Sequence, residues 1–550
     1  MSQERKKLLE EITARKEQSE LAREESRERH RQHLAWQYLS RNQKEVAEKI
    51  LEGRYEFLKE AGWGFLDKFM IFLKTIGFLK VLESVGGKGY VRRMIAISKL
   101  LLTYQMKVLL GISSMNQVPD MLFSDTGLLM VLGFTAKQIK KGVCNRSKKR
   151  GKKRKGPIHK DTLADALEKF DVEEVEKILN SSVKILNKGG FIDDGIYIED
   201  ATDIETTKKC KGCGRKTTDE EHINKKTGEI MVIPKTVYGF KLLVIRGVKS
   251  GIVVAAKFIK IQESEKNYTL SLIKQAQKNI GDKIKVLLID RGFIDGIALW
   301  KIKHDFKIDF VIPATTAMDI TKDARSLRNG YNKEYIWREM TEEISAIGIK
   351  GLTSYDQYGD PRGEHNKKNR YSKSFEGNPI NVVMVTKWDK KEYKRGKEKV
   401  FLTTLRVDKP ISVIKKYKLR SLIENTTFRE LKTGWLIEHI PKKTESAVRT
   451  HTFLTVCMYN MCKAYRSQLG KEVTEQGIRR FRTETFAQTR NKVVIIAEDH
   501  YGIFDLEEFA ILVGNPPKYF LSISPQKFKK EYGIETKLQP SIKKTSGEKI

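Results

Sequence analysis

Hydrophobic residues change their spacing near residue 190, and this change separates two kinds of structure. From about 57 to 132 they recur at helical spacing, with Pro119 as the only proline, which predicts a compact helical region. A further helix is predicted from about 160 to 186. Beyond it, short apolar runs and alternating apolar and polar positions indicate β-strands.

The part of the chain after residue 190 predicts a sheet flanked by helices. Its elements follow in the order β-β-β-α-β-α-β, at 196–200, 237–246, 251–261, 268–280, 284–289, 295–303 and 308–312. Three consecutive strands followed by alternating helices and strands predict a mixed sheet, and this order is that of the ribonuclease H-like fold.

A second group of strands is predicted further along the chain. Residues 318–406 lose the alternation of helices and strands but contain two strand-like runs, at 381–386 and 399–407, so we expect a β-rich insertion there. Pro410 then suits the first position of a long helix, and Gly434 suits its end.

The expected fold class is therefore α/β: a ribonuclease H-like mixed sheet with a β-rich insertion, preceded by an α-helical N-terminal region. The expected parts of the chain are a charged helical segment at 1–50, a helical domain at 51–145, a basic linker at 146–160, the first part of the core at 161–317, the insertion at 318–406, the second part of the core at 407–515 and a basic tail at 516–550.

Composition restricts the function. The 550 residues include 105 Lys and Arg against 70 Asp and Glu, which gives a formal net charge of +35. With 39% hydrophobic residues the chain can build cores, which excludes a disordered tail or a collagen-like fibre. Nucleic acid is the expected partner, because neutralised phosphates release condensed counterions. A protein that is merely basic, such as a ribosome-associated factor, is the alternative.

Part of this charge is concentrated in one segment. Nine of the fifteen residues from 146 to 160 are Lys or Arg, none is acidic, and two glycines and a proline disfavour a regular element. We expect a flexible arm that follows DNA phosphates, the alternative being a solvated connection without a specific partner. Its candidate DNA-binding residues are Arg146, Lys148, Lys149, Arg150, Lys152, Lys153, Arg154 and Lys155.

The sequence predicts neither a membrane segment nor a secretion signal. The most apolar stretch, 94–112, is interrupted by Lys99 and Lys107, and the charged first residues lack an apolar signal core. Five cysteines are few and odd in number for a disulfide framework. We therefore expect a cytoplasmic, nucleoid-associated protein without a membrane partner.

Two aspartates close predicted strands. Asp290 follows the apolar run 286–289 and Asp200 ends 196–200. The carboxyl ends of central strands are where α/β sheets place their sites, and if the two strands are neighbours these carboxylates can share a metal ion. An Asp in such a position can instead cap a turn. Asp203, which would face oppositely on a continuing strand, is a rival for the first ligand.

A third candidate carboxylate lies in the helix predicted after Pro410. Tyr417, Arg420 and Glu424 stand at i, i+3 and i+7, which puts a phenol, a guanidinium and a carboxylate along one stripe of a helix. One stripe can serve one site. On spacing alone, an exposed helix face with an internal Arg–Glu pair is the simpler interpretation.

This stripe resembles the signature of a known family, the DDE transposases of prokaryotic insertion sequences, in the branch marked by Tyr-x2-Arg-x3-Glu-x6-Lys. Here it is Tyr417-Lys-Leu-Arg420-Ser-Leu-Ile-Glu424. Lys432 departs from the pattern, because it lies eight residues beyond Glu424 instead of seven. A one-residue helical bulge would restore its phase.

Other segments resemble the same family. Ile198-Glu-Asp200 is similar to its first-aspartate motif, Asp290-Arg-Gly-Phe to its second, and Tyr238-Gly-Phe-Lys-Leu to the strand between them. A β-rich insertion between the second aspartate and the glutamate also fits this branch.

The resemblance implies a core that hydrolyses a phosphodiester and then joins the 3′-hydroxyl end to target DNA by a two-metal mechanism. The catalytic residues and metal ligands would be Asp200, Asp290 and Glu424, because Mg²⁺, with Mn²⁺ as a possible substitute, takes carboxylate oxygens.

The same resemblance implies how DNA is held. Tyr417 and Arg420 would hold phosphate near the transposon end, with Lys432 assisting as a point charge. We expect the helical domain and the basic linker to bind double-stranded DNA, both the inverted-repeat ends and the target, and the chain to act as a homodimer on it. The expected activity is transposition. A ribonuclease H-like nuclease that only hydrolyses DNA, or a catalytically inactive DNA-binding descendant, is the alternative.

Cys210-Lys-Gly-Cys213 has the spacing of half a zinc site, and His222 follows nearby. No other cysteine pair in the sequence has metal-like spacing and no fourth ligand can be named. We therefore expect a tight turn with reduced thiols, and not zinc.

Overall fold

The chain divides into two compact units. The computed structural model describes residues 40–55, 57–61, 66–86, 95–134, 157–223, 230–330, 332–359, 378–389, 394–395, 398–482, 484, 492–498, 500–514 and 525–534, with the single residues 13, 15, 18, 19, 138, 139 and 142. The sheet unit comprises Thr75–Gly89 and Leu167–Ile478. The terminal unit comprises Met1–Lys74, Tyr90–Ala166 and Arg479–Ile550.

The described part of the sheet unit contains one mixed sheet of 11 strands. Five of them are β3 (Ile196–Thr206), β5 (Ile230–Gly247), β6 (Val253–Lys260), β7 (Val286–Ile289) and β8 (Asp309–Pro313). β5 runs antiparallel to β3 and β6, whereas β7 runs parallel to β3 and β8. The resulting order, β6-β5-β3-β7-β8, confirms the predicted mixed α/β fold.

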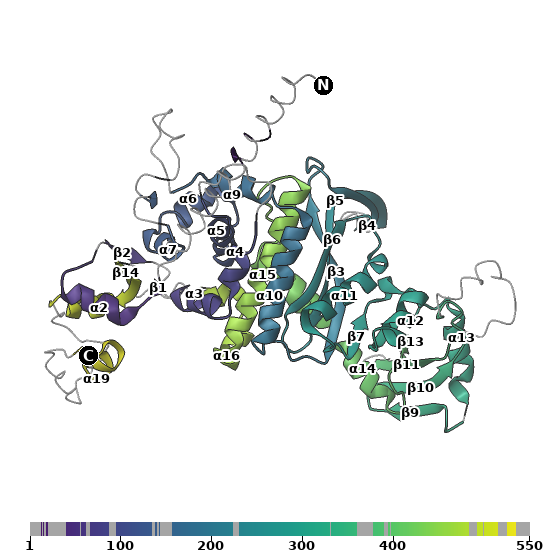
Figure 1. Ribbon diagram of the computed structural model, residues 1–550. Coiled ribbons are helices and arrows are strands. Elements are labelled where there is room, and N and C mark those ends of the chain that lie inside the picture. Colours follow the sequence, from purple (N-terminus) through teal and green to yellow (C-terminus); the bar gives the residue numbers. More distant parts are fainter. Residues whose placement is uncertain are drawn as a thin grey trace, which may run out of the picture. The chain divides into compact units, whose positions relative to one another are not determined.

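Several helices pack against the sheet or against one another. They include α10 (Val172–Lys188), α11 (Thr269–Ile280), α12 (Gly296–His304) and α15 (Glu445–Ser467). α10 and α15 lie side by side (Figure 1), and α11 and α15 contact β6. The fully buried Asn460 ties α15 to β6, since its side-chain amide accepts from the Val253 N–H at 2.9 Å and donates to the Val253 carbonyl at 2.8 Å. The unit also contains the short helices α4 (Phe78–Glu83) and α16 (Lys471–Glu475). A third, α17 (Ile478–Phe481), begins at Ile478, the last residue of the sheet unit.

The predicted insertion is β-rich, but its strands extend the main sheet. It contains α13 (Asp319–Ser326), β9 (Ile336–Met340), β10 (Ile344–Leu352), β11 (Ile380–Asp389), β12 (Lys394–Arg395) and β13 (Lys399–Thr403). β13 pairs antiparallel with β8, and β11, β10 and β9 follow in order. Only β11 and β13 were predicted, because Gly, Ser and Ala weaken the strand signal of β10. β4 (Gly214–Ile223), a largely polar partner of β5, was also not predicted.

The helix expected after Pro410 begins and ends as predicted but is not continuous. α14 covers Pro410–Lys418, and π-helical turns follow at Ile423–Phe428 and Glu430–Gly434. Gly434 is required by close packing, since a Cβ there would lie 2.2 Å from Cγ2 of Ile478.

The described part of the terminal unit joins helices to a four-stranded sheet. Its helices are α2 (Gln43–Leu51), α3 (Leu66–Thr75), which ends at the unit boundary, α5 (Ile97–Leu109), α6 (Val118–Met121), α7 (Thr126–Val131), α9 (Lys160–Leu167), α18 (Leu506–Leu512) and α19 (Pro525–Tyr532). The strand order is β1 (Ser40–Arg41), β15 (His500–Asp505), β14 (Lys492–Ala497) and β2 (Phe57–Ala61). No helix in the described residues is long and apolar enough to span a membrane.

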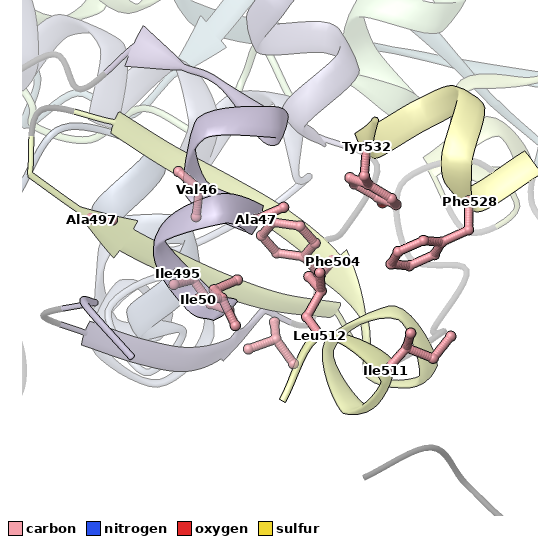
Figure 2. Packing of buried hydrophobic residues seen from close by; sticks show 11 residues of the cluster. Val46, Ala47, Ile50, Ile495, Ala497, Phe504, Ile511, Leu512, Phe528 and Tyr532 are labelled. Atoms are coloured by element: carbon pink, nitrogen blue, oxygen red, sulfur yellow. The ribbon is translucent and has the colours of Figure 1, made fainter. Parts of the chain in front are cut away.

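The core of this small sheet joins residues 46–50 to residues 493–532. Figure 2 shows Val46 and Ile50 of α2 packed with Ile495, Phe504 and Tyr532 from the C-terminal segment. Side chain and backbone also meet across 460 positions, where Gln43 accepts a hydrogen bond from the Ile503 N–H at 3.1 Å. The expected core extended to residue 515, and this pairing was not predicted, because strand partners so distant leave no local signal.

Candidate active site

The two candidate aspartates lie on or next to neighbouring parallel strands, β3 and β7. β3 and β7 are parallel with Glu199 opposite Ile289, so the next residues, Asp200 and Asp290, lie at the same level of neighbouring strands. Asp290 stands just beyond the end of β7, whose four residues are all buried. β3 continues past Asp200 to Thr206, so the prediction that Asp200 ends its strand is wrong, and only Asp290 follows the end of a strand. The two aspartates are neighbours because their strands pair in this register.

Arg420 links these aspartates to Glu424. Its Nη1 lies 2.8 Å from Oδ2 of Asp200 and 3.9 Å from Oδ1 of Asp290, and its Nη2 lies 2.8 Å from Oε1 of Glu424. Arg420 sits in the turn after α14, and Glu424 in the first π-helical segment. The structure therefore gathers the three candidate carboxylates around one guanidinium.

The three carboxylates differ in exposure. The side chain of Asp200 is 12% exposed, against 43% for Asp290 and 54% for Glu424. Burial raises the pKa of Asp200 to about 6, assisted by the charges of Asp290 and Glu424, while the hydrogen bond from the Ala201 N–H and the charge of Arg420 act in the opposite direction. Asp200 is the member of the group that the protein holds most firmly.

Tyr417 faces the same cluster from α14. Burial raises the pKa of its phenol well above the ordinary value; Arg420 lowers it, and the carboxylates of Asp290 and Asp200 raise it further. Its ring also packs on Phe401, with the centroids 4.8 Å apart. Tyr417 therefore presents a neutral hydroxyl beside the acids, with its ring held by the sheet.

Lys432 is engaged elsewhere. Its Nζ lies 2.9 Å from Oε1 of Glu438, and both side chains are one-third exposed. The backbone between Glu424 and Lys432 is π-helical, as in the Arg429 N–H that bonds the Glu424 carbonyl. This is the helical bulge that the shifted spacing called for, although the lysine pairs with Glu438 in this structure.

Asp203 lies on the same strand as Asp200 but in a different setting. β3 is continuous through both residues, and Asp203 pairs across the sheet with Lys241. The carboxylate that contacts Arg420 is that of Asp200.

The eight basic residues singled out between Arg146 and Lys155 lie outside the described residues.

Cys210 and Cys213 lie in the turn between β3 and β4 as free thiols, the first buried and the second half-buried. Gly212 makes this turn with φ of +84°, in the left-handed region that favours glycine. The side chain of His222 is outside the described residues, so the expected absence of zinc stays a prediction.

The candidate site offers hard oxygen donors, which suit Mg²⁺. Across the described residues, no three His, Cys, Asp or Glu side chains are already spaced to hold an ion. Arg420 explains this spacing, because it lies among the three carboxylates. The carboxylates are thus the donor type that Mg²⁺ takes, and in this structure each of them lies within 4 Å of the Arg420 guanidinium.

One family of known proteins is similar to the part of the chain that carries this site. The family described as "Transposase DDE domain" matches residues 192–461, a range that contains all three carboxylates. No protein with a curated description matches the chain. A cryo-EM structure of the piggyBac transposase synaptic complex with hairpin DNA is similar at 10% identity and a TM-score of 0.35, over 77% of this chain and 79% of that one. So low a TM-score carries no further inference. The family match shows that residues 192–461 of this chain are similar to the transposase DDE domain.

Proposed function

We propose that this protein is an active DNA transposase of the insertion-sequence type, which cleaves the phosphodiester at the ends of its element and joins the freed 3′-hydroxyl to target DNA. The observation that carries the proposal is the convergence of Asp200, Asp290 and Glu424 on Arg420, inside the region that is similar to the transposase DDE domain. A buried carboxylate with a raised pKa and specific charged partners from distant segments marks a candidate functional site.

The proposed roles follow from exposure and charge. Asp200, Asp290 and Glu424 would hold Mg²⁺ or Mn²⁺, which when bound stabilises the attacking and leaving oxygens of an in-line displacement. Asp200 is a rigid ligand because it is buried, whereas the more exposed Asp290 and Glu424 side chains can adjust to the substrate.

Arg420 has two alternative partners in this proposal. In the free protein it neutralises the carboxylates; with DNA bound, its planar fork is suited to two oxygens of one phosphate. Its departure from Asp200 and Glu424 would let the carboxylates converge. Tyr417 would donate a hydrogen bond from its neutral hydroxyl to a phosphate oxygen beside Arg420.

DNA is the proposed partner of the rest of the chain as well. The net charge of +35 favours a polyanion, and we assign the helical residues 51–145 and the basic linker 146–160 to binding the inverted-repeat ends. Two copies of the chain would be needed to pair two ends in one complex.

The test is incubation of the purified full chain with DNA that carries the element's own ends, with Mg²⁺ or with EDTA, scoring cleaved ends and joined products separately. Asp290→Asn should abolish metal-dependent cleavage and leave salt-sensitive DNA binding intact. Asp203→Asn is the matched control, because it changes an aspartate of the same sheet that does not contact Arg420. Equal loss in both variants would refute the site.

Two other outcomes distinguish the alternatives. Cleavage without joining of a pre-cut 3′ end would identify a nuclease that only hydrolyses DNA. Binding with neither product would identify a DNA-binding descendant that has lost its chemistry.

A further inference from the structure

Arg246 is a buried arginine at the end of β5, with 4% of its surface exposed. Its Nε donates to the Gly247 carbonyl at 2.9 Å and its Nη2 to the Val248 carbonyl at 3.2 Å. Its Nη1 donates to the Leu422 carbonyl and to the Thr426 hydroxyl, both at 3.1 Å. One side chain thus joins the end of a core strand to a turn that lies 176 to 180 positions later.

The bonding partners of Arg246 are all neutral oxygens. Burial lowers the pKa of the guanidinium, although the more distant charges of Asp194 and Glu430 oppose this. A buried cation held by neutral groups contributes little net stability compared with an apolar side chain of similar volume. Its neighbours on β5, Leu243 to Ile245, are apolar and fully buried, so an apolar residue would suit this position if packing were its only role.

The two distant partners of Arg246 flank Glu424. Leu422 precedes it by two residues and Thr426 follows it by two, and the Thr426 hydroxyl also donates to the Leu422 carbonyl. This is where the helix widens into its π-helical turn. Arg246 therefore holds the turn that carries Glu424 by hydrogen bonds on both sides of that residue.

The strand position of Arg246 is close to that of the first aspartate. In the antiparallel pairing of β3 with β5, Arg246 is opposite Ile198, two residues before Asp200. The guanidinium of Arg246 thus ties the turn that carries Glu424 to β5, the strand that pairs with the one that carries Asp200.

We infer that Arg246 is a positioning residue, which fixes where the Glu424 carboxylate stands relative to Asp200 and so sets the affinity of the site for a divalent metal. The inference rests on the proposed function, because it assigns Glu424 a ligand role. Residues that orient metal ligands typically change metal affinity 10- to 100-fold when they are replaced.

The experiment measures Mn²⁺ affinity of the full chain by calorimetric titration, together with thermal unfolding. Arg246→Lys keeps the charge but loses the fork, and Thr426→Val removes the hydroxyl but keeps the shape. We expect each of these two variants to weaken Mn²⁺ binding about tenfold or more. Thr426→Ser, which keeps the hydroxyl, should bind Mn²⁺ like the wild type.

Arg466 supplies the matched control. It is also buried, at 2% exposure, and its guanidinium donates to the carbonyls of Val473 and Thr474 at 2.9 and 3.1 Å, away from the carboxylates. Arg466→Lys should lower the melting temperature to a similar extent as Arg246→Lys and leave Mn²⁺ affinity unchanged.

A double-mutant cycle separates positioning from general destabilisation. In a Glu424→Gln background, Arg246→Lys should cause no further loss of Mn²⁺ affinity, since the group it positions is gone. The same loss in both backgrounds, or unchanged affinity in Arg246→Lys, would overturn the role of Arg246. If Asp290→Asn also leaves Mn²⁺ binding unchanged, the proposed metal site itself is wrong.

Discussion

A guanidinium nitrogen of Arg420 lies 2.8 Å from Oδ2 of Asp200, although the two residues are 220 positions apart in the chain. The other terminal nitrogen holds Glu424 at the same distance, and Asp290 is 3.9 Å away. Arg420 is thus the shared counterion of the whole acid cluster. A metal ion and this guanidinium would compete for the same oxygens.

Replacing Arg420 with Gln should therefore increase the effect of a divalent ion on the free protein. Without the guanidinium the three carboxylates repel one another, and a bound ion relieves this repulsion. We expect Mn²⁺ to raise the melting temperature of Arg420→Gln by several degrees more than that of the wild type. Differential scanning fluorimetry with Mn²⁺ and with EDTA measures this difference.

Arg449→Gln is the control for this prediction, because Arg449 pairs with Glu445 at the same i, i+4 spacing in another part of the chain. An equal Mn²⁺ effect in both variants would show that Arg420 does not compete with the ion.

The raised pKa of Asp200 predicts a pH dependence of stability. Burial raises it to about 6, above the ordinary value of 3.8, so between these values the folded protein binds a proton that the unfolded chain does not. The free energy of unfolding in EDTA should therefore fall as pH rises from about 4 to about 6, by on the order of 2 kcal/mol from this residue. Urea unfolding at several pH values, compared with Asp200→Asn, isolates this contribution. Parallel profiles of the two proteins would contradict it.

Replacing Lys432 tests whether this lysine leaves Glu438 and binds a DNA phosphate in the complex. If the lysine contacts phosphate in the complex, Lys432→Ala should weaken binding and reduce the slope of log affinity against log salt by about 1. Stability should change by less than about 1 kcal/mol, because the pair is one-third exposed. Titrations of end DNA at several salt concentrations distinguish these cases. An unchanged slope would leave Lys432 as a surface residue only.

The sheet leaves no room for a side chain at Gly239. A Cβ at this position would lie 2.2 Å from the Ile204 carbonyl, so Gly239→Ala must distort the pairing of β5 with β3. We expect a loss of about 1 to 3 kcal/mol in the free energy of unfolding by urea. Gly195→Ala is the control, since nothing lies within 4 Å of its added Cβ. Similar losses in both variants would show that crowding at Ile204 is not the cause.

Local pattern in the sequence was enough to predict the central elements of the sheet unit. The four-residue apolar run of β7 and the Asp that follows it indicate a buried strand ending at a site, and Pro410 and Gly434 mark the ends of a helical segment, because these signals lie within a few residues of one another. The same short motifs brought Asp200, Asp290 and Glu424 forward as candidates.

Relations between distant segments were decided only by the tertiary structure. The pairing of Glu199 with Ile289 sets the two aspartates side by side, and the π-helical turn held by Arg246 directs Glu424 toward them. The four-stranded sheet, which pairs strands of residues 40–61 with strands of residues 492–505, is likewise not indicated by any local pattern. Sequence spacing measures distance along the chain, whereas these contacts depend on which strands pair and in which register, and that choice is made by packing of the whole core.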